Sequence, residues 1–174
     1  MSSYIFLPIN VGMSDEQAKK ILSFPIVGIS YQQAMDFCKW RTDIEKRRGS
    51  PFKIRLLSIK EFKKYNQLKD SISVDSCSNF NYKGMKICKN GYFQLPDLKN
   101  GIMQIASFRS NAFGLYEMSG NVSEIVYEKD SACGGNFDEK AIQALKCKTF
   151  IVPNSSTGFR TIAYKIGDFR FEVR

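Results

Sequence analysis

The 174-residue sequence contains no histidine. Catalytic systems built on a Ser-His or Cys-His pair are therefore excluded, together with imidazole sites for zinc or copper and the two-histidine iron site. The five cysteines are widely spaced and form no CxxC pair, so neither a zinc ribbon nor a thioredoxin-type motif is supported. Any chemistry would have to use Cys, Tyr, Lys, Asp or Glu side chains.

Long hydrophobic runs are also lacking. No segment approaches the roughly 20 apolar residues that span a bilayer. Residues 1–11 carry no positive charge, and Pro8 and Asn10 interrupt the place where the apolar part of a secretion signal would continue. By default we expect a cytoplasmic chain with free thiols. A Cys77–Cys88 pair that closes a loop in an oxidising compartment is the alternative.

The composition that is present is typical of one folded domain. Hydrophobic residues make up 43% of the chain and aromatic residues 13%, enough for a sizeable core. The 26 Lys and Arg residues exceed the 17 Asp and Glu residues, which gives a formal charge of +9. Such an excess attracts polyanions. The basic residues are spread along the chain and no nucleic-acid motif accompanies them, so nucleic acid is disfavoured as a partner.

Capping signals and hydrophobic periodicity predict two helices. Ser30 and Gln33 form a capping-box pattern ahead of a helix with one apolar face, and Ser58 and Glu61 repeat the pattern. A short helix is also expected near residues 14–22. Strands are predicted over residues 53–57, 159–164 and 169–173.

Residues 70–111 are rich in Ser, Asn, Gly, Tyr and Lys and show little periodicity. A loop of this length is uncommon inside a compact domain and indicates a functional or ion-braced region. A Gly-Asn pair at Gly120 and Asn121 predicts a turn beyond it.

Five short segments stand out in order along the chain. They are residues 25–40 (PIVGISYQQAMDFCKW), 55–62 (RLLSIKEF), 111–124 (NAFGLYEMSGNVSE), 134–137 (GGNF) and 158–160 (GFR). They resemble the motifs PVVGVSW, RLPTEAEWE, NxFGLYDMxGNVWEW, RGGSW and GFR of the formylglycine-generating enzyme (sulfatase-modifying factor) superfamily. The third segment is the most specific of them.

The resemblance implies a single α+β domain with a formylglycine-generating-enzyme-like fold related to C-type lectins, with little regular secondary structure and long ordered loops. Residues 25–174 would form the sulfatase-modifying-factor-like domain. Residues 1–24 would replace the family's longer N-terminal β-hairpin region. Four residues stand where the family usually has Trp, so the chain resembles a divergent and shortened member: Tyr31, Phe62, Ser123 and Ile125.

The oxidase members of the family hold copper with a closely spaced pair of cysteines after the Gly-Gly motif, and thiolates suit Cu(I). Here residues 138–145 contain no cysteine, so copper is disfavoured. An oxidase would need Cys133 and Cys147 to lie within a few ångströms of each other and to bind Cu(I). The iron-dependent sulfoxide synthases need histidines that this chain lacks. The resemblance therefore indicates a protein that is not an enzyme.

Calcium, as a structural ion, is the cofactor that the resemblance implies, since it prefers carboxylate and carbonyl oxygens. The alternative is that Glu124 is only a buried hydrogen-bonding carboxylate that braces the turn. We expect Cys38 to be a core residue and Arg160 to be a structural ion-pair partner. One family calcium site is matched by Glu117, Gly120, Val122 and Glu124, and a second, less closely, by Asn79, Phe80, Asn100 and Ile102, where Asn100 replaces an Asp of the family.

The leading interpretation is a non-catalytic member of the superfamily that acts as a binding or assembly scaffold. Its partner would be another protein or a surface ligand, contacted through the variable segment between Phe137 and Pro153. Family members are frequently exported. A divergent formylglycine-generating oxidase acting on a substrate cysteine is one alternative, and a polyanion or nucleic-acid binder that uses the basic surface is the other.

Overall fold

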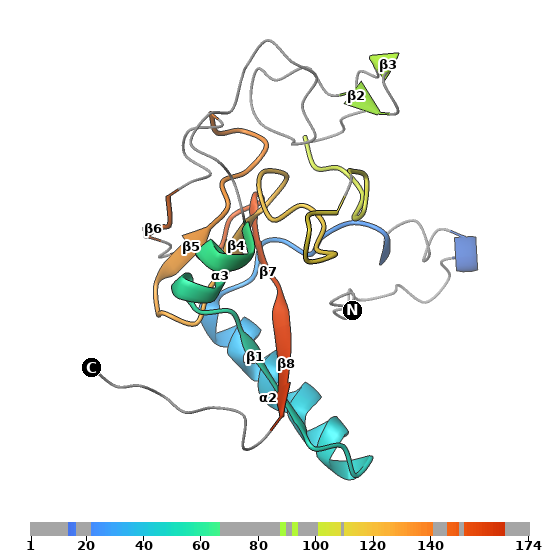
Figure 1. Cartoon of the computed structure of the whole chain (residues 1–174), viewed down its shortest axis with the longest axis vertical. Coiled ribbons are helices and arrows are strands. Elements are labelled where there is room, and N and C mark those ends of the chain that lie inside the picture. The colour runs from blue at the N-terminus through green and yellow to red at the C-terminus, as the bar shows by residue number, and fades with distance from the viewer. Residues whose placement is uncertain are drawn as a thin grey trace.

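The computed structural model describes residues 14–16, 22–66, 101–108, 110–140, 146–149 and 152–165, and the backbone of residues 88–89 and 92–93. The helices are α2 (Tyr31–Arg47) and α3 (Ile59–Asn66), and the strands are β1 (Phe52–Leu56), β2 (Cys88–Lys89), β3 (Tyr92–Phe93), β4 (Ser123–Ile125), β5 (Ser131–Cys133), β6 (Lys148–Thr149), β7 (Thr157–Phe159) and β8 (Thr161–Lys165). Much of the described chain between them is irregular, as Figure 1 shows. Within these residues no helix is both long and apolar enough to cross a membrane.

Helix α2 begins after Ser30, as the sequence predicts. The Ser30 Oγ accepts a hydrogen bond from the Gln33 N–H at 3.2 Å, and the Gln33 Oε1 accepts one from the Ser30 N–H at 2.8 Å. These two bonds confirm the predicted capping box. The helix ends at Arg47, two residues before Gly49, whose φ of 71° suits a residue without a Cβ.

Helix α2 packs against a two-stranded sheet of β1 and β8 (Figure 1). The strands are antiparallel, with Leu56 opposite Thr161. The Thr42 side chain joins the helix to the sheet, because its Oγ1 accepts a hydrogen bond from the Ile54 N–H at 2.9 Å and donates one to the Ile54 carbonyl at 3.3 Å. The helix thereby satisfies backbone groups of β1 that β8 does not reach.

The strand predicted over residues 53–57 is confirmed, displaced by one residue. The single strand predicted over residues 159–164 is two strands instead. β7 pairs in parallel with β4, β8 pairs with β1, and Arg160 lies between them. A hydrophobic pattern cannot reveal this change of sheet, because it does not indicate which strand each segment pairs with. The strand predicted over residues 169–173 lies outside the described residues.

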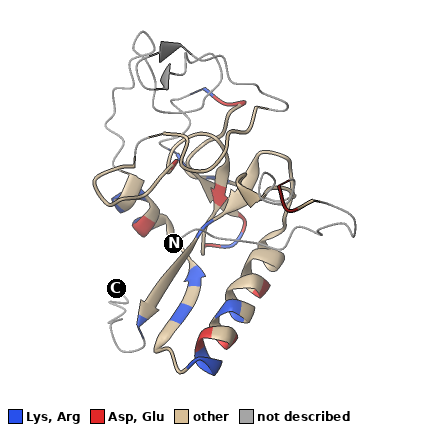
Figure 2. Ribbon diagram, turned by 90° about the vertical axis from the view of Figure 1, so that its right-hand side faces the viewer, with Lys and Arg blue, Asp and Glu red and all other residues tan. Residues whose placement is uncertain are grey.

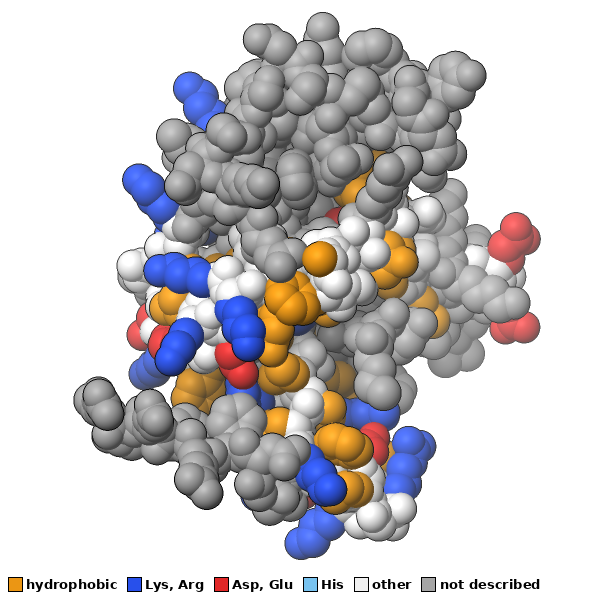
Figure 3. Space-filling model, in the orientation of Figure 1, with side chains coloured by type: hydrophobic (Ala, Val, Ile, Leu, Met, Phe, Trp, Pro, Cys, Tyr) orange, Lys and Arg blue, Asp and Glu red, His pale blue; other side chains and the backbone are white. Residues whose placement is uncertain are grey.

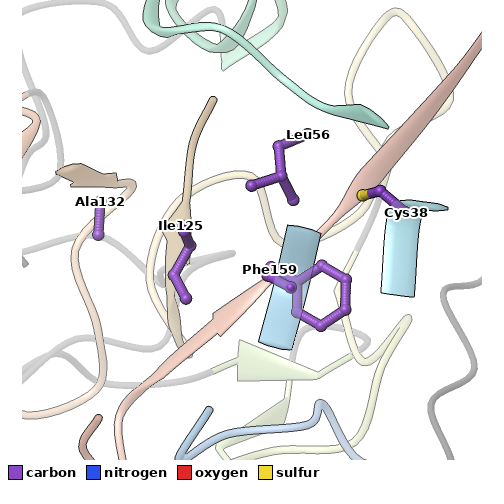
Figure 4. Packing of buried hydrophobic residues seen from close by; sticks show 6 residues of the cluster. Cys38, Leu56, Ile125, Ala132 and Phe159 are labelled. Atoms are coloured by element: carbon purple, nitrogen blue, oxygen red, sulfur yellow. The ribbon is translucent and has the colours of Figure 1, made fainter. Parts of the chain in front are cut away.

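The second sheet has the strand order β6-β5-β4-β7 and lies between two hydrophobic clusters. Figure 4 shows part of the first cluster, in which the Cys38 side chain lies near Leu56 and Phe159, so Cys38 is the core residue that we expected. Burial raises the pKa of the Cys38 thiol to about 12. The first cluster consists of Ala34, Cys38, Leu56, Ile125, Ala132 and Phe159, and the second of Leu57, Phe62, Met118, Val126 and Cys133.

Strand β7 also contacts the segment that leads into α2. A Cβ on Gly158 would lie only 2.1 Å from the carbonyl oxygen of Ile26, so no other residue fits there without displacing this segment. The Gly28 N–H donates hydrogen bonds to the carbonyls of Asn154 at 3.0 Å and Thr157 at 3.3 Å. The segment before α2 is therefore fastened directly to β7.

Helix α3 is connected to β1 by an ion pair. The Glu61 carboxylate accepts hydrogen bonds from the two terminal nitrogens of Arg55, each at 2.7 Å, and from the Ser58 N–H at 2.9 Å. The Glu61 N–H returns a bond to the Ser58 Oγ at 3.3 Å, which confirms the second capping box. The hydrogen bond from Arg55 is the main reason that the pKa of Glu61 falls to about 2.

Truncation of the core should destabilise the fold. Leu56 is fully buried, and we expect Leu56→Ala to lower the free energy of unfolding by about 2–5 kcal/mol, because it removes apolar contacts and leaves a cavity. Val152 is 68% exposed, so Val152→Ala should change stability by less than about 0.5 kcal/mol. Urea denaturation measures both. Equal effects would contradict the placement of Leu56.

The Arg55–Glu61 pair should make stability depend on pH. We expect Glu61→Gln to lower the free energy of unfolding by about 2 kcal/mol at neutral pH. The pKa of Glu61 is lower in the folded chain, at about 2, than its ordinary value of 4.5. The contribution of the carboxylate is therefore complete above pH 4.5 and is lost as the pH falls towards 2.

Denaturation at several pH values tests this dependence. The difference between the wild type and Glu61→Gln should narrow over that acidic range. Glu45→Gln is the control, because its partners Arg41 and Arg48 are 40% and 65% exposed, and ion pairs with such solvent-exposed partners one helical turn away contribute little. A difference that is independent of pH would show that the carboxylate is not held by Arg55.

Candidate functional site

A buried ion pair joins two neighbouring strands of the second sheet. Glu124, in the middle of β4, is 5% exposed, and Arg160 follows β7 directly. The Arg160 Nε donates to both carboxylate oxygens at 2.8 Å, and its Nη2 also contacts the carboxylate. The pair confirms our expectation for Arg160. Burial lowers the pKa of Arg160, but the charge of Glu124 and its hydrogen bonds outweigh that effect, so the pKa is raised and the guanidinium stays charged.

The same guanidinium also binds the chain ahead of the turn. Its Nη2 donates to the carbonyl of Tyr116 at 2.9 Å and to that of Glu117 at 3.5 Å. Arg160 therefore joins the end of β7 to strand β4 and to the loop that precedes Gly120, both of which lie more than 30 residues earlier in the sequence.

The Glu117 side chain points into another loop. Its carboxylate accepts hydrogen bonds from the backbone N–H groups of Ala106 at 2.9 Å and Phe108 at 3.1 Å. Burial raises the pKa of Glu117, and these hydrogen bonds partly oppose the rise. Glu117 has a φ of 44°, an uncommon conformation for a residue with a side chain. The carboxylate thus serves to hold residues 101–108 in place.

Asn121 holds the same loop and was not among the site residues predicted from the sequence. It is 1% exposed, its Oδ1 accepts a hydrogen bond from the Met103 N–H at 2.8 Å, and its Nδ2 donates to the Met103 carbonyl at 3.1 Å. Gly120 and Asn121 both have positive φ, as expected for the predicted turn. The Gly-Asn pair in the sequence could have indicated this role of Asn121, because Asn tolerates a positive φ and its side-chain amide can form hydrogen bonds with the backbone.

Of the four residues of the first predicted calcium site, Gly120, Val122 and Glu124 are buried, whereas Glu117 is half-buried and binds the loop of residues 101–108. Ile102, from the second predicted site, precedes the Met103 that Asn121 binds. The other members of the second site, Asn79, Phe80 and Asn100, lie outside the described residues.

In the observed arrangement the two carboxylates of this turn accept hydrogen bonds from groups of the protein, and the calcium site stays a prediction. Arg160 binds both oxygens of Glu124, and backbone N–H groups bind both oxygens of Glu117. Across the described residues, no three His, Cys, Asp or Glu side chains gather where they could hold a metal ion. The alternative interpretation, a buried carboxylate that braces the turn, agrees with the contacts of Glu124.

Cys133 and Cys147 form a disulfide, with their Cα atoms 4.1 Å apart. The pairing of β5 with β6 sets Ala132 opposite Lys148, and continuing that register sets Cys133 opposite Cys147. In this structure the two cysteines are therefore not the free thiols that we expected. The register could not be foreseen, because it depends on a pairing between strands rather than on a local pattern.

The disulfide and the ion pair belong to the same part of the second sheet. Glu124 lies opposite Cys133 in the register of β4 and β5, and side chains directly opposite each other share a face of a sheet. Cys133 is 1% exposed and belongs to the second hydrophobic cluster. The two charged side chains, Glu124 and Arg160, are thus paired with each other, and the two cysteines are joined by the disulfide.

A family model for the sulfatase-modifying factor enzyme 1-like domain matches residues 10–165 of this chain. The division into residues 1–24 and 25–174 stays a prediction. Among curated proteins, no relative matches the sequence.

Several solved structures share the fold. PvdO from Pseudomonas aeruginosa is 18% identical, with a TM-score of 0.58, and the alignment covers 83% of this chain and 63% of PvdO. Treponema denticola variable protein 1 is 15% identical, with a TM-score of 0.55 and coverage of 83% and 72%. CarF is 17% identical, with a TM-score of 0.53 and coverage of 83% and 69%.

These likenesses confirm the expected fold, a formylglycine-generating-enzyme-like α+β domain with little regular secondary structure. The chain spans less than two thirds of the length of PvdO. At identities of 18% and below, the likenesses are evidence about the fold alone.

The cysteines should differ in reactivity. In the native protein at pH 8 we expect iodoacetamide to leave Cys38 unmodified, because burial raises its pKa to about 12. Unfolding without a reductant should expose Cys38 to the reagent, whereas Cys133 and Cys147 should react only after reduction. Peptide mass spectrometry identifies the labelled residues. Labelling of Cys133 in unfolded, unreduced protein would contradict the disulfide.

Proposed function

The chain belongs to the sulfatase-modifying factor enzyme 1-like domain family, and from this premise we propose that it is a non-catalytic member that serves as a binding or assembly scaffold. The main support is that the reactive side chains of the described turn and sheet are bound to one another. Glu124 is paired with Arg160, Cys133 with Cys147, and the Cys38 thiol is buried in the core.

The distribution of thiols argues against a copper oxidase. Cu(I) needs thiolate ligands, and residues 138–145, where the family places its cysteine pair, contain none. The Cys38 thiol has a pKa of about 12, so it is protonated at neutral pH. Cys133 is inside the second hydrophobic cluster, where a substrate cysteine cannot reach it without local unfolding.

A binding role is supported by loops that side chains hold in place. Glu117 and Asn121 fasten residues 101–108, and Arg160 fastens the loop before Gly120. Surface residues on such loops can change without loss of the fold, because the contacts that hold the loops lie beneath them. This is the property that a scaffold for a variable partner requires.

Aromatic side chains on the same loop surface offer contact area. Phe113 is 46% exposed and Tyr116 is 43% exposed, and the Phe113 ring packs edge-on against Tyr65 with 5.2 Å between centroids. Protein interfaces are enriched in Tyr and Phe. We therefore favour another protein or a surface ligand as the partner.

The expected variable segment between Phe137 and Pro153 is held at its described ends. Cys147 is fixed by the disulfide, and Lys148 forms an ion pair with Glu139. Residues anchored in this way can present the chain between them to a partner. We therefore retain the segment between Phe137 and Pro153 as the proposed contact with the partner.

The copper oxidase is the second candidate, and one observation favours it. Cys133 and Cys147 do come within bonding distance, which is the first of the two conditions that an oxidase would require. Reduction would convert them into two adjacent thiols. Whether these thiols bind Cu(I) tightly therefore separates the two candidates.

The polyanion binder has weaker support. Figure 2 shows that Lys and Arg residues are spread along α2, β1 and α3. On the face in Figure 3 the described Lys and Arg side chains lie in several separate places among hydrophobic side chains. A spread of this kind gives general attraction to anions but no single binding surface.

Anaerobic Cu(I) titration of the reduced protein against a competing chelator tests the proposal. We expect Cys133→Ser and Cys147→Ser to leave the Cu(I) affinity and stoichiometry unchanged, because the wild type has no dedicated site at these positions. Cys38→Ala is the control for a buried thiol elsewhere.

An activity assay completes the test. With Cu(I) and oxygen supplied, a cysteine-containing peptide should yield no aldehyde detectable with a hydrazide probe. Tight binding of one Cu(I) that is lost only in the Cys133 and Cys147 variants, together with aldehyde formation, would replace the scaffold with the oxidase.

A further inference from the structure

We propose that the outer face of helix α2 pairs with the same face of a second copy of this chain, in a two-fold dimer of antiparallel α2 helices centred between Trp40 and Asp43. Such a dimer does not require the scaffold role. Three features support it: a half-exposed tryptophan, the hollow beside that tryptophan, and the order of the charges along the helix.

Helix α2 has one covered face and one exposed face. Ala34 and Cys38 are buried and Thr42 is bonded to β1, so these residues face the sheet. In Figure 2 the helix lies at the edge of the described molecule, with β1 and β8 on one side of it. Exposed residues recur at three- and four-residue intervals away from the sheet and form the outer face: Asp36, Lys39, Trp40, Asp43, Lys46 and Arg47.

Trp40 is an apolar anchor that the core holds from beneath. The residue is 40% exposed, and its ring centroid lies 5.5 Å from that of Phe37. The Phe37 ring in turn lies 5.5 Å from that of Phe159, in the first hydrophobic cluster. One side of the indole is thus fixed while the other meets solvent. Tryptophan side chains are among those that contribute most to binding at protein interfaces.

The hollow beside Trp40 suits an aromatic side chain. It has a volume of about 520 Å³ and is lined by Trp40, Asp43, Lys46 and Arg47. The indole offers a flat apolar wall, and the two basic side chains offer cations, which are attracted to the face of an aromatic ring. A two-fold axis beside Trp40 would place the tryptophan of each copy in the hollow of the other.

The charges of the outer face favour the antiparallel arrangement. About a centre between Trp40 and Asp43, position 36 of one helix lies opposite position 47 of the other. Asp36 of each copy would therefore meet Arg47 of the other copy, with Lys46 beside it. Basic residues gather at the C-terminal end of α2, as Figure 2 shows. In a parallel pair each charge would meet its own kind and repel it.

The charges that would meet in the dimer are not paired within one copy. Among the described residues, neither Asp36 nor Arg47 takes part in an ion pair, whereas Arg41 pairs with Glu45. Asp36 accepts a hydrogen bond from the Gln32 side chain at 2.9 Å, which leaves further acceptor capacity on its carboxylate. Both side chains are exposed, so a second copy can reach them.

The area available makes this a weak dimer. The 17 residues of α2 span about 25 Å, and one helix face from each copy buries less than the roughly 1,200 Å² of a stable interface. We therefore expect a dissociation constant on the order of 10–100 μM.

The chain itself supplies the probe for the first experiment, because Trp40 is its only tryptophan. Sedimentation equilibrium should show monomer and dimer in exchange. Over the same range of concentrations the Trp40 emission should move to shorter wavelength and become less accessible to acrylamide. A wild type that stays monomeric well above that range overturns the proposal, and the outer face is then open to a different partner.

Charge reversals test the arrangement of the two helices. Asp36→Lys and Arg47→Glu should each weaken the dimer about tenfold, because each sets like charges against each other twice. An equimolar mixture of the two variants should recover the wild-type affinity, because the charges that meet are again opposite. Arg47→Glu is the stricter test. It removes two positive charges from a chain with a formal charge of +9, so general repulsion between copies would fall and association would strengthen.

Lys63→Glu is the matched control. Lys63 is exposed on α3, and its reversal changes the net charge as much as Arg47→Glu does, but it should not weaken the dimer. The antiparallel pairing is wrong if the two reversals act alike, or if the mixture of Asp36→Lys with Arg47→Glu associates no better than either variant alone. A wild-type dimer whose Trp40 emission does not change uses another surface and also overturns the proposal.

Discussion

A buried negative charge in the middle of β4 is the constraint on which the functional part of this protein depends. The Glu124 carboxylate is compensated there by the guanidinium of Arg160, which lies beside it because β7 runs parallel to β4. The chain changes sheet at Arg160: β7 belongs to the second sheet, whereas β8 pairs with β1. One side chain thus fixes the position of the turn, the end of a strand and the junction between two sheets.

Much of the fold could be predicted because its signals are local. The capping boxes at Ser30 and Ser58 and the turn at Gly120 depend on residues a few positions apart. The family motifs, which are also short, predict the fold class. Other features depend on which strands meet. The division of β7 from β8 and the pairing of Cys133 with Cys147 follow from long-range register, which the sequence pattern of a three-residue strand does not encode. The calcium ligands were inferred from motif positions, and the motif did not indicate that Arg160 would bind the same oxygens.

The irregular loops of this domain are ordered by buried side chains rather than by repeating backbone hydrogen bonds. Glu117 and Asn121 each satisfy backbone groups of residues 101–108, whereas Phe113 and Tyr116 leave much of their side chains exposed. A fold organised in this way separates the residues that hold the structure from those that meet a partner. Members of one family can therefore retain the scaffold while the chemistry at its surface or in its clefts differs.

The antiparallel pair of β1 and β8 has a consequence for synthesis on the ribosome. β1 follows α2 directly, whereas its only strand partner lies at the far end of the described chain, beyond the whole second sheet. The segment before α2 also cannot make its contacts until β7 has been synthesised, since Gly28 and Ile26 contact residues of that strand. The amphipathic helix thus emerges from the ribosome long before the surfaces that cover it. Contacts between such distant parts of a chain form slowly, so the nascent chain carries an exposed apolar helix face through most of its translation, a state in which molecular chaperones bind.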